Sequence, residues 1–112
     1  LQRIVGVRRA MEIALLNPTL TAAQALDLGL VTRVVPDDRL LDEGTALAEE
    51  LAAGPTRALA ATKRLIWDGV GRSVEDCLPD ESRTVSELSG TEDAREGLAA
   101  VIERRAPEYK GR

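Results

Sequence analysis

The residues best suited to chemistry are the cations near the C-terminus. Arg104, Arg105, Lys110 and Arg112 fall within nine residues of one another and bracket Tyr109. Guanidinium groups bind phosphate through paired hydrogen bonds, and an aromatic ring nearby can pack on a purine. Arg104 and Arg105 would also complement the negative C-terminal end of a last helix. The residue types alone leave both roles open, a phosphate contact and a helix-end contact.

The rest of the sequence lacks the usual catalytic groups. It contains no His, which removes the commonest general base and the Ser-His and Cys-His pairs, and effectively excludes a zinc cluster. No phosphate loop or nucleophile elbow is present, and Gly69 and Gly71 lack the strand-then-helix context of a dinucleotide fingerprint. The carboxylates fall on polar helix faces, where a solvated surface is the ordinary interpretation. We therefore predict no catalytic residue and no metal ligand.

Composition indicates one small folded domain. The chain has 112 residues, 44% apolar and 30% charged, which is typical of a globular protein rather than a disordered one. A net charge of −4 and only two aromatic side chains, Trp67 and Tyr109, argue against a nucleic-acid partner. The single cysteine, Cys77, excludes an internal disulfide framework and is expected in the core. With no membrane-length apolar run and no signal peptide, we predict a cytoplasmic protein without a membrane partner.

Helical periodicity runs through most of the chain and predicts a mainly α fold, with five to six short helices and one short strand. The first helix must end before Pro18. A capping box formed by Thr21 and Gln24 starts the second helix, and Gly29 supplies the left-handed residue that ends it. The Val-rich residues 31–35, bounded by glycine and proline, predict this strand or an extended segment in its place.

The second half of the chain predicts further helices. Pro55 suits a first helical position, Ser73 can cap the next helix, and the last helix begins near Thr91. Pro79 predicts a kink or a restart in the helix between them. Trp67 lies off the apolar stripe of its helix, so it either packs along neighbouring aliphatic stems or marks a second buried surface.

Two segments resemble the crotonase (enoyl-CoA hydratase/isomerase) superfamily. Residues 21–36 (TAAQALDLGLVTRVVP) are similar to the stretch after the family's spiral core, where a Ser/Thr-capped helix leads into Gly-Leu-Val and a Val-Val pair. Residues 91–112 (TEDAREGLAAVIERRAPEYKGR) are similar to its closing pattern of Glu-Asp, Glu-Gly, Ala-Phe, Glu-Lys-Arg, Pro, Phe and Lys. Gly54-Pro55 and Thr62-Lys63 also fit, so the resemblance spans essentially the whole chain.

The resemblance implies that residues 1–112 are the C-terminal helical part of an α/β crotonase-like superhelix. Residues 1–36, including the strand at 31–35, would end the core, and residues 37–112 would form a helical trimerisation segment. The N-terminal catalytic half, which holds the oxyanion-hole amides and the catalytic glutamates, would be absent, so this chain alone would be inactive. A start at Leu1 rather than Met also favours a fragment or a processed product.

The resemblance also implies a function. The parent protein would be an enoyl-CoA hydratase or isomerase of fatty acid metabolism, acting on a CoA thioester through an oxyanion-stabilised enolate without a metal or a covalently bound cofactor. This segment would serve CoA binding, active-site cover and assembly into a homotrimer or a hexamer. Arg104 stands where the family usually has Lys, and Tyr109 and Lys110 stand at its Phe-Lys pair, so these three are the predicted CoA contacts. Val101 replaces the usual Phe, which removes an aromatic surface there.

The alternative hypothesis is a free-standing helical protein-interaction module. It is motivated by the short length of the chain and by the absence of every catalytic group.

Overall fold

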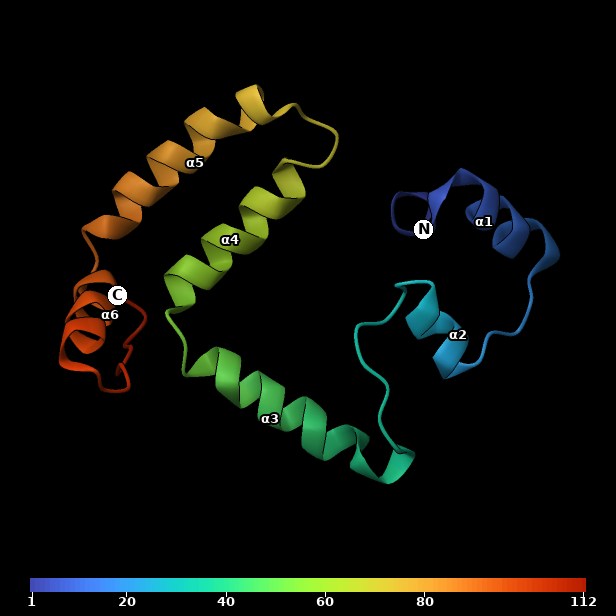
Figure 1. The fold of residues 1–112 in the computed structure, drawn as a ribbon, viewed down its shortest axis with the longest axis horizontal. Helices are drawn as coiled ribbons and strands as arrows, with labels where there is room; N and C mark the ends of the chain where they lie inside the picture. The colour runs from blue at the N-terminus through green and yellow to red at the C-terminus, as the bar shows by residue number, and fades with distance from the viewer. The chain divides into compact units, whose positions relative to one another are not determined.

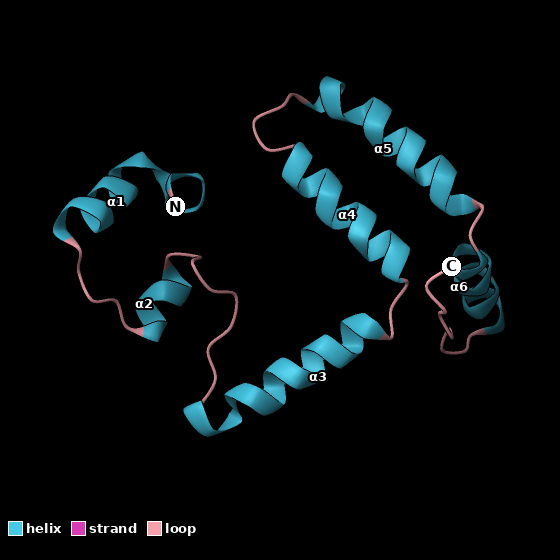
Figure 2. Ribbon diagram, turned by 180° about the vertical axis from the view of Figure 1, so that it is seen from behind, coloured by secondary structure: helices cyan, strands magenta, loops and turns pink.

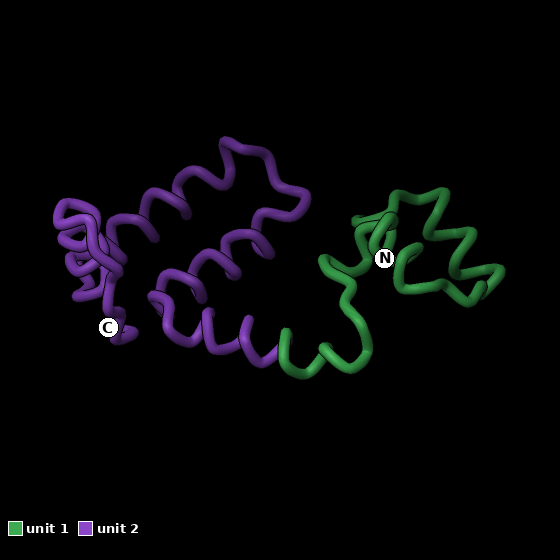
Figure 3. Tube along the Cα trace, turned by 60° about the horizontal axis from the view of Figure 1, so that its bottom comes forward, with its two compact units in different colours: residues 1–43 green, residues 44–112 purple.

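Helices make up all of the regular structure. A computed structural model describes residues Leu1–Arg112, with six α-helices, one 3-10 turn (η1) and no strand (Figures 1 and 2). The chain divides into two compact units, Leu1–Glu43 and Gly44–Arg112 (Figure 3). No helix combines the length and the apolar character that crossing a membrane would require.

The first helix, α1 (Gln2–Leu16), is interrupted near its start. Gly6 has φ 77 and ψ 163, a conformation essentially restricted to glycine, so the regular helix resumes at Val7. As predicted, α1 ends before Pro18, and Asn17 closes it in the left-handed conformation at φ 46.

The second helix, α2 (Ala22–Asp27), has the predicted ends. The Thr21 hydroxyl accepts the Gln24 N–H at 3.2 Å, and the Gln24 side chain accepts the Thr21 N–H at 2.8 Å, which confirms the capping box. Gly29 follows with φ 69, the left-handed conformation that only glycine adopts without a steric penalty.

The predicted strand at residues 31–35 is wrong. No bridge to another segment forms there, and Val31 and Val34 remain 40% and 42% exposed. Three valines between a glycine and a proline favour extended backbone, but a strand also needs a partner for its hydrogen bonds, and the chain provides none. The segment leads through η1 (Asp37–Arg39) into α3 (Leu40–Ala52).

The remaining helices are α4 (Thr56–Asp68), α5 (Val74–Ser89) and α6 (Glu92–Glu103). Pro55 stands at the N-cap of α4, one residue before the predicted position. Ser73 and Thr91 cap α5 and α6 as predicted, accepting the N–H three residues ahead at 3.2 and 3.1 Å. Helix α4 packs against α5, and α5 packs against α6 (Figure 1).

The predicted restart at Pro79 is also wrong, because α5 continues through it. Proline removes one backbone hydrogen bond, and Pro79 lies in the second turn, so only the Glu75 carbonyl loses its helical donor. The Arg72 guanidinium supports this turn by donating to the Asp76 carbonyl and, at 2.9 Å, to the Asp80 carboxylate. The latter hydrogen bond holds the pKa of Asp80 below its usual range.

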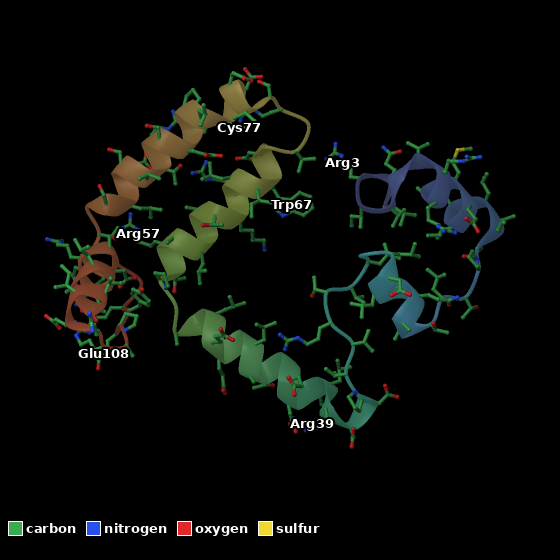
Figure 4. The ribbon with its side chains drawn as sticks, viewed as in Figure 1. Arg3, Arg39, Arg57, Trp67, Cys77 and Glu108 are labelled. Carbon is green, nitrogen blue, oxygen red and sulfur yellow. The ribbon has the colours of Figure 1, made fainter.

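Few apolar side chains are buried within the chain. Ala10 and Ala100 are the only buried ones, and Cys77, expected in the core, is half-buried beside Gly69. Trp67 is 67% exposed and projects from the side of α4 away from α5 (Figure 4). The helices therefore present open apolar faces, as expected for elements that need a further surface to complete their burial.

Candidate functional site

Residues 106–112 fold back along α6 and are fastened there by two carboxylates. The first belongs to Asp93, which is 6% exposed. Its Oδ1 accepts the backbone N–H of Lys110 at 2.7 Å, and its Oδ2 accepts that of Gly111 at 2.9 Å. The N–H of Asp93, which has no partner within the helix, donates to the Arg112 carbonyl at 3.0 Å. Three consecutive tail residues are thus bound to one helical residue.

The second carboxylate is that of Glu96, one turn further along α6. It forms a two-pronged ion pair with the Arg105 guanidinium, with 2.9 Å between Nη2 and Oε2, and accepts the Glu108 N–H at 2.8 Å. Glu108 lies beside α6 (Figure 4). Hydrogen bonding from Arg105, and then from the Glu108 N–H, lowers the pKa of Glu96 to about 2.

Tyr109 packs into the body of the second unit. Its ring is half-buried against Gly97, where a Cβ would lie 3.2 Å from the Tyr109 hydroxyl, so a larger residue would displace the ring. Tyr109 lines a cavity of about 190 Å³ together with Arg57 and residues of α5 and α6. Arg57 projects from the start of α4 (Figure 4). Much of the Tyr109 ring is therefore occupied in holding the tail.

Arg104 ends α6 in an unusual conformation. It has φ 55, a left-handed conformation in which helix ends usually carry glycine. Its side chain is exposed and forms no ion pair, whereas the adjacent Arg105 is bound to Glu96 and Glu103. The Arg104 guanidinium is free to bind an anion from solution.

Lys110 is the other free cation of the tail. Its backbone is pinned by Asp93, while its ammonium is exposed, forms no ion pair, and borders a cavity of about 370 Å³. Four acidic residues share this cavity. Glu96 is neutralised by Arg105, Glu92 pairs with Arg112 at 3.0 Å, and Asp93 accepts tail N–H groups, which leaves Glu108 without an ion pair. This pairing reduces the repulsion that an incoming phosphate would meet.

The structure separates cations that the sequence places close together. Arg105 and Arg112 are bound within the chain, which leaves Arg104 and Lys110. The backbone of Lys110 is attached at Asp93, near the start of α6, and Arg104 is at its end. At 1.5 Å per residue, about 16 Å of helix separates the two attachment points. The backbone attachments of these two cations therefore lie at opposite ends of α6.

Asp93 and Glu96 were not predicted from the sequence, where the carboxylates were interpreted as a solvated surface. An acidic residue in the first turn of a helix is common, and nothing local distinguishes Asp93. Its partners lie 17 and 18 residues further along the chain, so only the path of the tail reveals them.

The fold and the site define a helical segment with open apolar faces and two free cations at opposite ends of its last helix. A family model described as enoyl-CoA hydratase/isomerase matches residues 1–112. A Rhodobacter capsulatus protein named "Probable enoyl-CoA hydratase" is 38% identical over 112 residues, covering 100% of this chain and 44% of that protein. The 1,2-epoxyphenylacetyl-CoA isomerase of Escherichia coli is 36% identical, with 100% and 43% coverage.

Solved structures agree with the sequence relatives. An enoyl-CoA hydratase from Bacillus anthracis matches with a TM-score of 0.92 at 32% identity, over 99% of this chain and 43% of that one. The chain belongs to the enoyl-CoA hydratase/isomerase family. It spans less than half the length of the relatives that it matches.

Replacing Glu96 by Gln should make the free energy of unfolding less dependent on pH between about 2 and 4.5. The folded state lowers the pKa of Glu96 from 4.5 to about 2, so its contribution is complete above pH 4.5 and is lost as the pH falls through 2. The wild-type protein should therefore have the higher Tm above pH 4.5, and the difference should shrink toward pH 2. Thermal unfolding would be measured on a protein that contains this chain and is as long as the relatives it matches. A Tm difference that did not change with pH would contradict the assignment.

Proposed function

We propose that this chain is the C-terminal helical part of an enoyl-CoA hydratase/isomerase that acts on a CoA thioester through an oxyanion-stabilised enolate. The family match over residues 1–112 is the observation that carries the proposal. Residues 1–36 end the core, and residues 37–112 form the helical assembly segment. The amides that stabilise the enolate and the carboxylates that move protons belong to the N-terminal half of the full-length enzyme, so this chain alone is inactive.

The contribution of this segment to the reaction is binding. Arg104, Tyr109 and Lys110 contact the nucleotide end of CoA, and no catalytic residue or metal ligand lies among residues 1–112. The separation of the two free cations along α6 fits a ligand with phosphates at two places, such as the diphosphate and the ribose phosphate of CoA. Tyr109 offers only the exposed part of its half-buried ring.

The segment also serves assembly, as a homotrimer or a hexamer in the cytoplasm. The exposed apolar side chains support this part of the proposal, including Leu98, Val101 and Ile102 of α6 at 65%, 75% and 73% exposure. An enzyme of this class participates in fatty acid metabolism, needs no metal, and has no nucleic-acid or membrane partner.

The first test is the intact mass of the polypeptide, followed by hydration and isomerisation assays on a short enoyl-CoA. A mass more than twice 12.0 kDa, together with turnover of the thioester, supports the proposal. If the natural protein has a mass of 12.0 kDa, is a stable monomer and does not bind CoA, the result would instead favour a helical interaction module. Its open apolar faces would then bind a protein partner.

Arg104→Gly should stabilise the full-length enzyme. A non-glycine residue in the left-handed conformation costs roughly 1 kcal/mol, and glycine at φ 55 avoids that cost. The Tm should rise by a few degrees while binding of CoA weakens, since the guanidinium is lost. Asn17→Gly is the matched control, because asparagine already tolerates its φ of 46 and should gain less. A lower Tm for Arg104→Gly would contradict the prediction.

A further inference from the structure

Asp93 binds the tail more extensively than helix capping requires. Thr91 already caps α6 by accepting the Ala94 N–H at 3.1 Å, so the Asp93 carboxylate is not needed for that purpose. Both of its oxygens accept tail N–H groups, from Lys110 at 2.7 Å and Gly111 at 2.9 Å. The carboxylate is nearly sealed from water, and its partners are all backbone groups of the tail.

The tail conformation is adapted to this contact. Gly111 has φ 74, which few other residues adopt, and a Cβ there would lie 3.6 Å from the Thr56 hydroxyl at the start of α4. The Arg112 carbonyl closes the arrangement by accepting the Asp93 N–H at 3.0 Å. Residues 110–112 are therefore held between the first turns of α4 and α6.

We propose that Asp93 is a positioning residue that fixes residues 110–112 across the start of α6 and so places the Lys110 ammonium for a phosphate of CoA. The assignment of the phosphate rests on the proposed function, whereas the attachment of the tail rests on the hydrogen bonds alone. Asp93 does not touch the ligand. It restricts the tail before binding, so that less conformational entropy is lost when Lys110 meets its phosphate.

The electrostatics of the contact favour this role. A carboxylate near Lys110 could neutralise the ammonium and repel phosphate, but the Asp93 oxygens are directed to backbone N–H groups at the positive end of α6. No ion pair forms between Asp93 and the Lys110 ammonium. The contact thus holds the backbone of Lys110 while its charge stays available.

The first readout is cleavage by trypsin at the Lys110–Gly111 bond in the full-length enzyme, followed by mass spectrometry. The N–H groups on both sides of this bond are held by Asp93, so the folded tail should resist the protease. Asp93→Asn should speed cleavage at least tenfold, because hydrogen bonds to a charged acceptor are lost. Glu92→Gln is the matched control, since it removes the adjacent carboxylate, whose ion pair with Arg112 is exposed and screened by solvent, and should have a much smaller effect.

The second readout separates positioning from structural damage. Asp93→Asn should raise the KM for enoyl-CoA several-fold and leave kcat nearly unchanged. With an enoyl thioester of pantetheine, which lacks the nucleotide and its phosphates, the KM should not change. Gly111→Ala, which strains the tail but keeps Asp93, should show the same pattern more weakly and serves if Asp93→Asn fails to fold.

The outcomes distinguish the two parts. If cleavage by trypsin is unchanged in both Asp93→Asn and Gly111→Ala, the attachment of the tail by Asp93 is overturned. Faster cleavage with an unchanged KM for enoyl-CoA overturns the phosphate contact at Lys110, and with it the positioning role. A KM that rises equally for both thioesters shows general damage and also overturns the proposal.

Discussion

In the full-length enzyme, Arg104→Glu and Lys110→Glu should each raise the KM for enoyl-CoA about tenfold, and the double variant about a hundredfold. A charge-assisted hydrogen bond contributes about 1.5–3 kcal/mol, and solvent screening brings an exposed pair toward the lower end. About 1.4 kcal/mol corresponds to a factor of ten. The effects should multiply because about 16 Å of helix separates the two attachment points, and distant sites act independently.

Steady-state kinetics of the two single variants and the double variant would measure these changes in the KM for enoyl-CoA. The kcat should stay near its original value, since neither residue touches the reacting carbon in the proposed arrangement. Lys63→Glu on α4 is the charge-matched control, because Lys63 is also exposed and forms no ion pair. A double variant no weaker than either single one would place both cations on the same phosphate. An unchanged KM in all three variants would remove the CoA contact.

The second large effect concerns the 112-residue chain by itself, which should not unfold cooperatively. Burial of apolar side chains drives folding, and here Ala10 and Ala100 are the only buried apolar residues. Large side chains such as Leu41 and Val101 remain 82% and 75% exposed. The helices have good caps, but isolated helices of about 12–15 residues are marginal in water without tertiary packing.

Urea titration followed by circular dichroism would show a broad, shallow loss of helix, and a dye that fluoresces on apolar surfaces should bind strongly. Trp67, which is 67% exposed, should emit at the wavelength of solvated indole, and its emission should shift to the blue in the full-length enzyme. A sharp unfolding transition of a monomer, with blue-shifted Trp67 emission, would instead support an independently folded interaction module.

Helix ends were predictable from the sequence because their stabilising contacts are local. Thr21 and Gln24 form a capping box three residues apart, and Thr91 accepts the N–H of Ala94 over the same spacing. Gly29 has the positive φ expected at a helix end. In each case all the residues that determine the helix end lie within a few positions of one another, so their types and spacing are enough to predict it.

Two local predictions failed because the outcome depends on other segments. Residues 31–35 have the composition of a strand, but a strand forms only where a second one pairs with it. A proline inside a helix usually breaks or kinks it. Helix α5 nevertheless continues through Pro79, because only one backbone hydrogen bond near its start is lost and Arg72 binds the adjacent turn.

The candidate site divides in the same way. The sequence by itself determined the family and the helical character, and it predicted the cations Arg104 and Lys110 as CoA contacts, since all of these depend on residue types in a recognisable order. Only the tertiary structure decided that the two cations lie at opposite ends of α6 and that Asp93 holds the tail. Capping contacts span three residues, whereas Asp93 and its partners are 17 and 18 residues apart, so their meeting depends on how the chain turns back after α6.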